Sequence, residues 1–229
     1  MQKPLVSIIL TLYEIKLDYL NECLNSLLQQ SYQDIEIICI NDASPTINYD
    51  SITNISDKIR LYKNEINLGM NKSVNRAFSL AEGKYIVRLG SDDIFHKDLI
   101  KEEVEFLENN ETIGAVCCEL ERFGKTYQHI TRPKIWDFTE IVTNRKLAGT
   151  GYAGGMMFRQ ALLKTCAIDE SLKMCEDFDF HLQILKQMPI ASIHKILYYY
   201  RSHDTNLCKK VKKEERWTLI DKILSKYNK

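Results

Sequence analysis

Two pairs of adjacent carboxylates in this sequence could bind a metal ion or act in acid–base catalysis. The first pair is Asp92–Asp93. Adjacent carboxylates repel each other unless a cation or a hydrogen-bond donor separates their roles. A hard divalent ion such as Mg²⁺ or Mn²⁺ prefers carboxylate oxygens and completes its shell with phosphate oxygens and water. One of these aspartates could hold a metal ion while the other accepts a ribose hydroxyl. The alternative is a pair that caps a helix in a solvated turn.

The second pair, Glu176–Asp177, stands where a helix is expected to begin. One of the two could act as a general base that removes the proton of an attacking hydroxyl. Spacing alone favours the alternative of helix capping, because acidic residues stabilise the start of a helix whatever their function.

Four further side chains have types that suit a nucleotide ligand. Asp42 could accept the imide N–H of a uracil ring beside the aromatic wall of Tyr13, or it could be a turn aspartate that caps the next segment. Arg201 and His203 follow an apolar segment, and either could contact a diphosphate. A neutral imidazole could also complete a metal shell, whereas ordinary hydrogen bonding is the alternative for a lone histidine.

Apolar patterning predicts the elements that position these groups. Continuous apolar runs predict strands covered on both faces, and apolar residues three or four apart predict helices. The two alternate through the amino-terminal half, which favours an α/β fold with a mostly parallel central sheet and helices on both faces. The expected strands are 5–10, 35–40, 59–62, 85–89 and 115–120; the expected helices are 17–28, 71–80 with a left-handed cap at Gly83, and 98–108 capped by Asp98.

Polar segments follow three of these strands, at 11–14, 41–44 and 90–93. Ligands of open α/β sheets bind beyond the carboxyl ends of the strands. Each segment alone is weak evidence, because Asp, Asn, Ser and Gly are also ordinary turn residues. Their shared position predicts a binding site along one edge of the sheet.

The second half of the sequence is less regular. Glycines cluster at 149, 151, 154 and 155, and strands are expected at 156–158 and 196–200 with a helix at 178–188 between them. We expect this half to shape the second side of a cleft. The final segment, 206–229, reads as a basic amphipathic helix, which could lie on an anionic membrane surface. The favoured interpretation is a closing helix that packs on the domain, with an apolar side formed by Trp217, Ile220, Leu224 and Tyr227.

Composition excludes several classes of protein. Lys plus Arg and Asp plus Glu both number 31, so the net charge gives no indication of nucleic-acid binding. The sequence has no secretory-signal pattern and no apolar run near the ~18 residues of a membrane span. Seven cysteines without a Cys-x-x-Cys pair predict reduced, mostly buried thiols in a cytosolic protein. They are Cys23, Cys39, Cys117, Cys118, Cys166, Cys175 and Cys208.

Eight short segments, in this order along residues 4–205, resemble the family 2 glycosyltransferases of GT-A fold. Segment 37–44 is similar to the family's Val-Asp-Asp-Gly-Ser motif, and 91–93 is similar to the end of its metal-binding Asp-x-Asp or Asp-Asp run. The ordered set is far more specific than any one motif. The segments are 6–13, 37–44, 67–69 with Asn75, 82–86, 91–93, 154–159, 176–177 and 200–203.

The resemblance implies a single displacement with inversion at the anomeric carbon, and it implies a role for each matching residue. Asp177 would be the base, while Asp93 and His203 would hold Mn²⁺ or Mg²⁺ against the departing diphosphate. The acceptor side would include Gly154, Gly155, Glu176 and Arg201. The donor-binding residues would be Thr11, Tyr13, Glu14, Asp42, Asn67, Lys72 and Asp92.

Four positions depart from the family pattern. Glu14 stands where Asn is commoner, Asn41 replaces the first Asp of a pair, and Ala43 replaces Gly. Val74 occupies the place of a frequent donor-binding Arg, and Lys72 could supply that charge instead. These changes concern the details of donor binding more than the class of reaction.

We therefore expect a GT-A glycosyltransferase domain over 1–205, with a nucleotide-sugar-binding half (1–120) and an acceptor-side half (121–205), followed by the helix in 206–229. The expected enzyme is a metal-dependent, hexosyltransferase-type (EC 2.4) glycosyltransferase of bacterial surface-polysaccharide type. It would move a sugar from a nucleotide-sugar donor, UDP-linked by first choice, to a hydroxyl of a glycan or lipid-linked glycan. Its expected location is the cytoplasm, with peripheral contact to the inner face of the membrane left open.

Two alternatives come from other functional classes. A sugar nucleotidyltransferase would need a glycine-rich phosphate loop after the first strand, but 11–16 contains no glycine. A catalytically silent module that binds glycans or scaffolds an assembly would release no UDP from a mixture of donor and metal.

Overall fold

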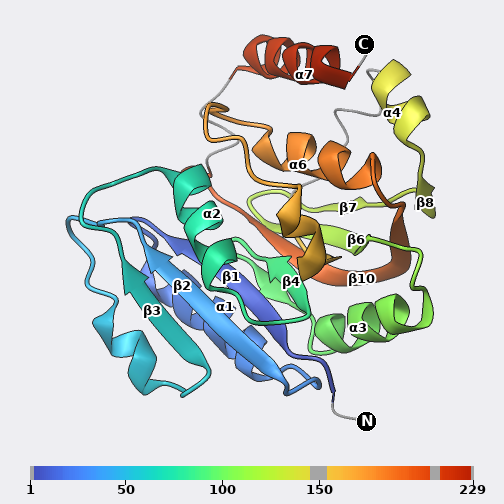
Figure 1. Cartoon of the computed structure of the whole chain (residues 1–229). Coiled ribbons are helices and arrows are strands. Elements are labelled where there is room, and N and C mark those ends of the chain that lie inside the picture. The colour runs from blue at the N-terminus through green and yellow to red at the C-terminus, as the bar shows by residue number, and fades with distance from the viewer. Residues whose placement is uncertain (1–2, 145–153, 207–211, 228–229) are drawn as a thin grey trace.

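The computed structural model describes residues 3–144, 154–206 and 212–227. Ten strands of this part form one sheet, with helices packed on both faces (Figure 1). This arrangement confirms the expected α/β class. Gly149, Gly151 and Cys208 lie outside the described residues, as do parts of the expected segments 1–120, 121–205 and 206–229.

The strand order is β3-β2-β1-β4-β9-β6-β10-β5, with β7 beside β6 and β8 beside β10. Strands β3, β2, β1 and β4 run parallel, whereas β9 lies antiparallel between β4 and β6. The parallel half therefore joins a mixed half through β9. The bounds are β1 Val6–Leu12, β2 Ile35–Asn41, β3 Ile59–Lys63, β4 Tyr85–Arg88, β5 Ile94–Phe95, β6 Ala115–Gly124, β7 Gln128–Ile130, β8 Ile135–Trp136, β9 Met156–Arg159 and β10 Ile190–Ser202.

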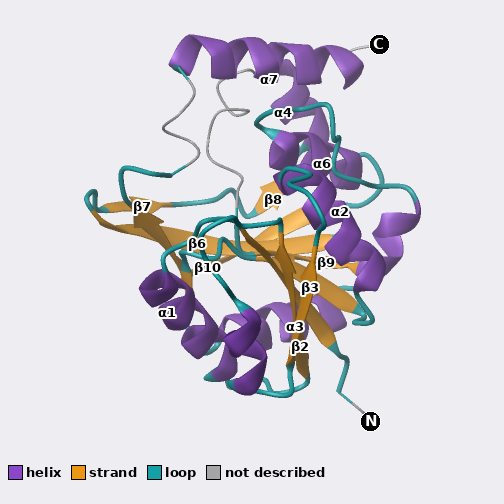
Figure 2. Cartoon of the chain, turned by 90° about the vertical axis from the view of Figure 1, so that its left-hand side faces the viewer, coloured by secondary structure: helices purple, strands orange, loops and turns teal. Residues whose placement is uncertain are grey.

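Helices α1 and α3 cover one face of the sheet, and α2, α6 and α7 lie on the other (Figure 2). Each face has its own hydrophobic core, because alternate residues of β1 and β2 point to opposite sides. The bounds are α1 Leu17–Leu28, α2 Met70–Leu80, α3 Leu99–Asn109, α4 Phe138–Thr143, α6 Glu176–Leu185 and α7 Lys213–Tyr227, with 3₁₀ helices at Asp50–Asn54 and Gln160–Lys164.

The register of β1 aligns the ends of three parallel strands. Leu12 of β1 pairs with Asn41 of β2, and Ile9 of β1 pairs with Arg88 of β4. The polar segments that follow these strands consequently lie along the same edge of the sheet. The shared edge predicted from the sequence is confirmed.

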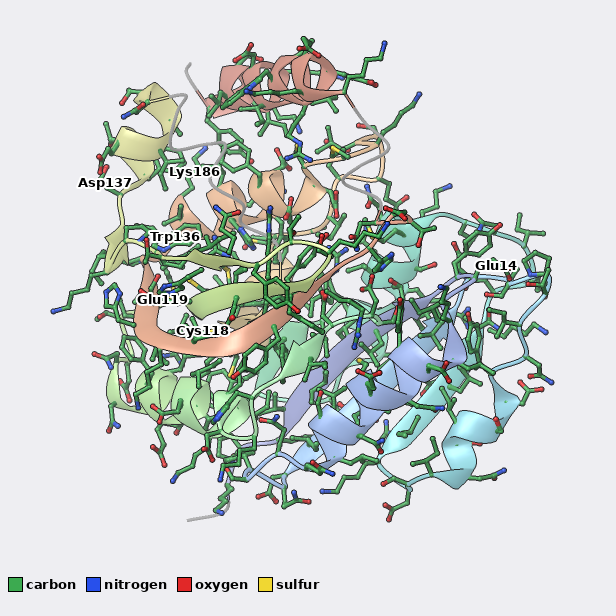
Figure 3. All side chains as sticks on the ribbon, turned by 180° about the vertical axis from the view of Figure 1, so that it is seen from behind. Glu14, Cys118, Glu119, Trp136, Asp137 and Lys186 are labelled. Carbon is green, nitrogen blue, oxygen red and sulfur yellow. The ribbon has the colours of Figure 1, made fainter. Side chains whose placement is uncertain are left out.

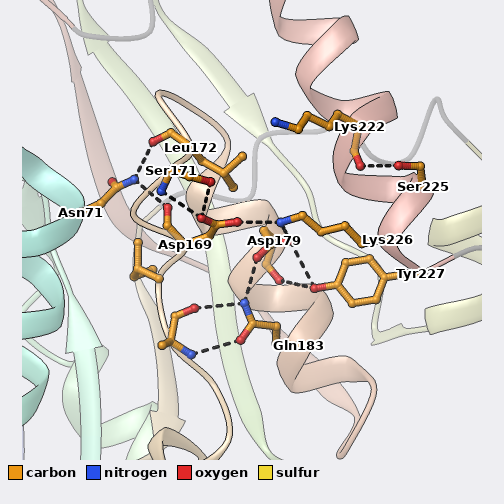
Figure 4. A network of polar contacts seen from close by, with 12 residues as sticks. Asn71, Asp169, Ser171, Leu172, Asp179, Gln183, Lys222, Ser225, Lys226 and Tyr227 are labelled. Carbon is orange, nitrogen blue, oxygen red and sulfur yellow. Dashed lines mark hydrogen bonds and ion pairs between the residues drawn. The ribbon is translucent and has the colours of Figure 1, made fainter.

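Helix α7 packs as the closing helix that the sequence favours. Its residues Ile220, Ile223 and Leu224 are buried in the core that α6 also lines. The ammonium group of Lys226 lies 2.8 Å from Asp169 and 3.0 Å from Asp179, so ion pairs join α7 to the domain (Figure 4). Among the described residues, no helix is both long enough and apolar enough to cross a membrane.

Two local expectations are corrected by the structure. Gly83 is not a left-handed cap, since α2 ends at Leu80 and Gly83 lacks a positive φ. Glycine is needed there because a Cβ would lie 2.6 Å from the backbone nitrogen of Ser7. Asp98 is the N-cap residue of α3, but its side chain makes no capping hydrogen bond.

The other helices and strands differ from the expected ranges mainly in where they begin and end. Helix α6 begins at Glu176, two residues before the expected start, and β10 extends over 13 residues. Of the six cysteines described, five are buried and Cys175 is partly exposed, as expected for reduced thiols.

Candidate functional site

The loop after β1 is tied to the loop after β2 through Glu14. Its backbone is left-handed, with a φ of 51°, and its N–H donates to the hydroxyl of Ser44 at 3.1 Å. Its carboxylate accepts from the N–H and hydroxyl of Thr46, which lowers the pKa of this exposed group. Figure 3 shows Glu14 at the outer end of the sheet. Thr11 is half-buried on β1, whereas the side chain of Tyr13 is 51% exposed.

The carboxylate of Asp42 organises the segment that leads into α2. Its Oδ1 accepts from Asn64 Nδ2 at 2.7 Å and from the N–H of Leu68 at 2.8 Å. Its Oδ2 accepts from the N–H of Gly69 at 2.9 Å. Asp42 therefore caps a segment that follows it, although this segment lies beyond β3 and not directly after Asp42. Since each carboxylate oxygen has two lone pairs, Oδ2 keeps one for a ligand donor.

Two predicted donor-binding residues lie in and beside this segment. Asn67 is exposed in the loop, and Lys72 is exposed in the first turn of α2. Val74 is buried, so it contributes no polar group at the position of the family's arginine. Arg76 binds the carbonyl of Lys63 at 2.9 Å. On α2, Lys72 is thus the charged side chain left exposed to solvent.

The adjacent aspartates have different surroundings. Asp93 is only 2% exposed, and its Oδ2 accepts from the hydroxyl of Tyr198. Its Oδ1 accepts from the N–H of Arg201 at 2.7 Å. Burial, and then the charge of Asp92, hold the pKa of the Asp93 carboxyl well above its ordinary value. Asp93 therefore joins β10 to the end of β4 as a buried group.

Asp92 is the aspartate that meets His203. The His203 Nε2 atom lies 2.7 Å from Asp92 Oδ2, and both side chains are partly exposed. Asn206 Nδ2 lies 3.1 Å from the same imidazole nitrogen, and the hydroxyl of Thr205 lies 2.8 Å from Nδ1. The structure brings together His203 and Asp92, whereas the expected pair was His203 and Asp93.

The donor set of Asp92 and His203 fits a divalent ion that is shared with phosphates. Across residues 3–144, 154–206 and 212–227, no group of three or more His, Cys, Asp or Glu side chains is arranged to hold a metal. Mg²⁺ sites that also use substrate phosphates commonly take only one or two carboxylates from the protein. One carboxylate and one imidazole therefore suit an ion whose remaining ligands are diphosphate oxygens and water.

Arg201 is held beneath Asp92 by its neighbours. Its Nε donates to the carbonyl oxygen of Asp92 at 2.7 Å, and its terminal nitrogen lies 2.6 Å from a carboxylate oxygen of Glu22. The guanidinium also stacks on Tyr19 and Phe123, 4.4 and 4.6 Å from the two ring centroids. These contacts make Arg201 a support for the backbone of Asp92.

Gly154 and Gly155 pass over the ring of Tyr198, with φ angles of 84° and 67°. A Cβ on Gly154 would overlap the Tyr198 hydroxyl, which itself binds Asp93. The N–H of Gly155 donates to the carbonyl of Arg88 at 3.3 Å. The two glycines thus lie between the aspartate pair and the end of β4.

The Glu176–Asp177 pair begins α6 after the left-handed Cys175, whose φ is 62°. Glu176 is 6% exposed, and its Oε1 lies 3.3 Å from the guanidinium of Arg88. Burial, and then the charge of Asp177, raise the pKa of the Glu176 carboxyl, whereas Arg88 opposes that rise. Asp177 is partly exposed, and its Oδ1 accepts from the N–H of Phe178 at 2.8 Å.

A series of contacts joins the segment bound by Asp42, the end of β4 and the start of α6. Gly69, which binds Asp42, precedes Met70, and the sulfur of Met70 lies 3.0 Å from a nitrogen of Arg88. Arg88 contacts Glu176 through its guanidinium and Gly155 through its carbonyl. Segments that are far apart in the sequence are therefore contiguous in the structure.

Sequence reasoning missed Arg88 and Tyr198. Arg88 is a charged residue at the end of an otherwise apolar strand, four positions before Asp92, and that position was an available signal. Tyr198 is one of three consecutive tyrosines, and nothing in the sequence marks it as the one that is fully enclosed.

The family is shown by comparison with known proteins. The profile of glycosyl transferase family 2 matches residues 7–166, so the chain belongs to that family. An uncharacterised glycosyltransferase of Methanocaldococcus jannaschii is 27% identical over 227 residues, which cover 95% of this chain and 78% of that protein. One of Haemophilus influenzae is 30% identical over 202 residues, covering 82% and 74%.

Solved structures show the same GT-A fold. TarS 1–349 of S. aureus, in complex with UDP-GlcNAc, superimposes with a TM-score of 0.75 at 20% identity, covering 96% of this chain and 65% of that one. The mannosyltransferase PcManGT of Pyrobaculum calidifontis, in complex with GDP-Man and Mn²⁺, gives 0.68 at 17%, covering 90% and 59%. This chain thus spans less than two thirds of either structure.

Proposed function

We propose that this protein is a metal-dependent, inverting glycosyltransferase of hexosyltransferase type that uses a UDP-sugar. The acceptor is a hydroxyl of a glycan or lipid-linked glycan of a surface polysaccharide, reached at the cytoplasmic side of the membrane. The observation that carries the proposal is a connected series of contacts. Asp92 contacts His203, and the adjacent Asp93 binds Tyr198. Gly155 packs on Tyr198 and binds the carbonyl of Arg88, whose guanidinium contacts Glu176 beside Asp177.

The donor would lie over the ends of β1, β2 and β4. The remaining lone pair of Asp42 Oδ2 would accept a base N–H, the exposed ring of Tyr13 would stack beside the base, and Lys72 would supply charge for phosphate. UDP is the first choice because complexes with UDP and with UDP-GlcNAc are known for TarS, which has the same fold. The GDP-Man complex of the mannosyltransferase makes GDP the second choice.

Asp92 and His203 would hold the divalent ion, and this assignment exchanges the roles expected for the two aspartates. Asp92 is partly exposed, whereas both oxygens of Asp93 accept hydrogen bonds inside the protein. A proton on His203 Nδ1, shared with Thr205, would leave the lone pair of Nε2 for the ion, which would replace the present contacts of Nε2 with Asp92 and Asn206. When bound there, Mn²⁺ or Mg²⁺ would supply positive charge that stabilises the departing diphosphate.

Asp177 would act on the acceptor. Its Oδ1 accepts from the N–H of Phe178, so Oδ2 remains available to take the proton of the acceptor hydroxyl. The hydroxyl oxygen forms a bond to the anomeric carbon as the bond from that carbon to the diphosphate oxygen breaks. The nucleoside diphosphate leaves with the electron pair of the broken bond, and the configuration at the anomeric carbon is inverted.

A panel of UDP-, GDP- and dTDP-sugars, each tested with Mn²⁺ and with EDTA, tests this function. We expect the protein to release UDP from at least one UDP-sugar when Mn²⁺ is present, and EDTA to abolish the release. Binding of donors without release of nucleotide from any of them would refute the proposal and favour the silent binding module. Release of nucleotide that EDTA leaves unchanged would refute the metal dependence.

A further inference from the structure

Arg88 occupies a central place that the proposed chemistry has not used. It is the last residue of β4, and its side chain is 26% exposed. Its two terminal nitrogens lie 3.3 and 3.4 Å from the same oxygen of Glu176, and one of them lies 3.0 Å from the sulfur of Met70. The guanidinium thus bridges the first residue of α2 and the first residue of α6.

Glu176 depends on this arginine for its charge. Its side chain is 8% exposed, and among the described residues the guanidinium of Arg88 is the side-chain group that it contacts. A buried carboxylate beside a second carboxylate is costly unless a cation compensates it. Loss of Arg88 would leave Glu176 and Asp177 to share a proton or to move apart.

The backbone before Glu176 sets the directions of the two acids. Cys175 adopts a left-handed conformation, with a φ of 62°, which is unfavourable for a residue other than glycine. The turn sends Glu176 inward to Arg88, while Asp177 stays partly exposed and caps the N–H of Phe178. A strained residue of this kind persists where the surrounding contacts hold it, and the ion pair of Arg88 and Glu176 is such a contact.

We propose that Arg88 is a positioning residue for the acceptor base: its guanidinium anchors Glu176 and thereby fixes the neighbouring Asp177 in place. This inference rests on the proposed function of Asp177. It assigns to Glu176 the role of an anchor, with the proton transfer left to its neighbour.

The other charged groups near the pair are few. After burial, the charge of Asp177 raises the pKa of Glu176. Burial, and then the charges of Asp177 and Glu176, raise the pKa of the Cys175 thiol, a rise that Arg216 of α7 opposes. Further along α6, burial, then the charge of Arg132 and then that of Arg88 lower the pKa of the His181 imidazole to about 3.

A second ion pair offers a matched control. Arg60 of β3 lies 3.2 Å from Glu36, a carboxylate as buried as Glu176, at the amino end of the strands. Glu36 also accepts from Ser7 and from the N–H of Glu82, so its place is fixed by more than the arginine. Arg60→Met removes an arginine from a buried glutamate without touching the proposed site.

The test compares wild type, Arg88→Met, Arg88→Lys and Arg60→Met in nucleotide release between pH 5 and 9, with the donor that the panel identifies. We expect Arg88→Met to lower kcat by roughly tenfold or more, to leave the KM for the donor within about twofold, and to move the acidic limb of the profile up by about one pH unit. Arg88→Lys should recover most of kcat, and Arg60→Met should match wild type. A normal kcat and profile in Arg88→Met, or a loss confined to KM, would overturn the proposal.

Urea unfolding between pH 5 and 8 gives a readout that needs no donor. If Arg88 neutralises Glu176, its removal raises the folded pKa of Glu176 further above the unfolded value. Such a group contributes stability at low pH that is lost as the pH rises. The urea midpoint of Arg88→Met should therefore fall relative to wild type from pH 5 to 8, and Glu176→Gln in that background should remove the fall.

Midpoints that run parallel to wild type at every pH would overturn the anchoring of Glu176 even if the enzyme is active. If the wild type releases nucleotide from no donor, the proposed function fails and the role of Arg88 in the reaction fails with it. An active wild type with an equally active Arg88→Met protein would overturn the role of Arg88 alone.

Discussion

The two ends of the parallel strands differ in how their charged side chains are bonded. At the amino end, the hydroxyl of Ser7 donates to Glu36 at 2.6 Å and accepts from the N–H of Gly83 at 2.9 Å. The N–H of Glu82 and the guanidinium of Arg60 also contact Glu36. The polar groups there bind one another, and their arrangement joins β1, β2 and the start of β4.

At the carboxyl end, polar groups remain open to a ligand and the backbone is strained. Within the described part of the chain, three non-glycine residues have positive φ, and all three lie in loops beside this end: Glu14, Ala43 and Cys175. Asp92, His203 and Asp177 are partly exposed there, and the carboxylates of Asp92 and Asp177 use only one oxygen each for hydrogen bonds to other described residues. The comparison teaches that incomplete bonding and backbone strain together mark the site, while burial of charge alone does not.

The largest effect should come from Asp177→Asn. An amide cannot take the acceptor proton, so transfer should fall by roughly 10²–10⁴-fold, while binding of UDP with Mn²⁺ changes by less than about twofold. Activity assays with donor and acceptor, beside calorimetry with UDP, would measure both. Asp137→Asn is the matched control, because Asp137 also accepts a backbone N–H at a helix start, that of Glu140 at 2.6 Å. Near-wild-type transfer by Asp177→Asn would show that the base is elsewhere.

The adjacent aspartates should separate into a ligand and a support. Asp92→Ala should abolish the part of UDP affinity that depends on Mn²⁺, since it removes a proposed metal ligand. Asp93→Asn should keep that dependence but lower the free energy of unfolding by about 1–3 kcal/mol, because one of its buried hydrogen bonds is lost. Calorimetry with UDP and urea unfolding measure the two effects. The opposite pattern would restore Asp93 as the metal ligand.

A buried acid that lies at neither end of the strands, Glu103, tests whether burial of charge alone marks a functional residue. Glu103 of α3 is fully buried, and neither of its carboxylate oxygens has a hydrogen-bond partner among the residues that the structure describes. Burial raises the pKa of this carboxyl well above its ordinary value. The stability that it contributes is present below its unfolded pKa and is lost as the pH rises toward the folded value.

Glu103→Met should therefore stabilise the protein by about 1–3 kcal/mol at pH 8, and by less at pH 4, with activity unchanged. Urea unfolding at the two pH values measures this difference. Glu105→Met, at an exposed position of the same helix, should show no such pH dependence. A loss of nucleotide release in Glu103→Met would mean that burial of charge does mark function here.

The smallest effect should come from Ala43→Gly. Ala43 has a φ of 55°, which costs an L-residue about 1–2 kcal/mol, against roughly 0.5–1 kcal/mol of added chain entropy for glycine. The substitution should raise the free energy of unfolding by about 0.5 kcal/mol. Ala81→Gly, at a φ of −72°, should lower it instead. If both substitutions destabilise the protein equally, Ala43 is not strained.

The parallel half of the fold was predictable because β1 and β2 are almost wholly buried, mainly apolar runs of seven residues, each followed by a turn with polar groups. The strands of the mixed half were harder to predict from the sequence. Strands β5, β7 and β8 have two or three residues, too few for a periodic pattern, and they form because longer strands offer them an edge. The pairing of β9 between β4 and β6 is likewise a long-range event.

The composition of the candidate site was predictable in part. Asp42, Asp92 and Asp177 could be selected from their positions after strands and at a helix start. The choice between Asp92 and Asp93 could not be made, because it depends on Tyr198, which encloses Asp93 from 105 residues away. Arg88 was missed for the same reason, since its partner Glu176 lies 88 residues further along the chain.

The central claim places a divalent ion and a diphosphate at Asp92 and His203, and the five histidines provide its most direct test. Mn²⁺ is paramagnetic and broadens the NMR signals of nearby protons, so substoichiometric Mn²⁺ added with UDP should erase the ring signals of His203 first. His129 and His194, which share the carboxylate of Glu119 on β6, should remain sharp. Broadening of His129 and His194 before His203, or equal broadening of all five, would contradict the account.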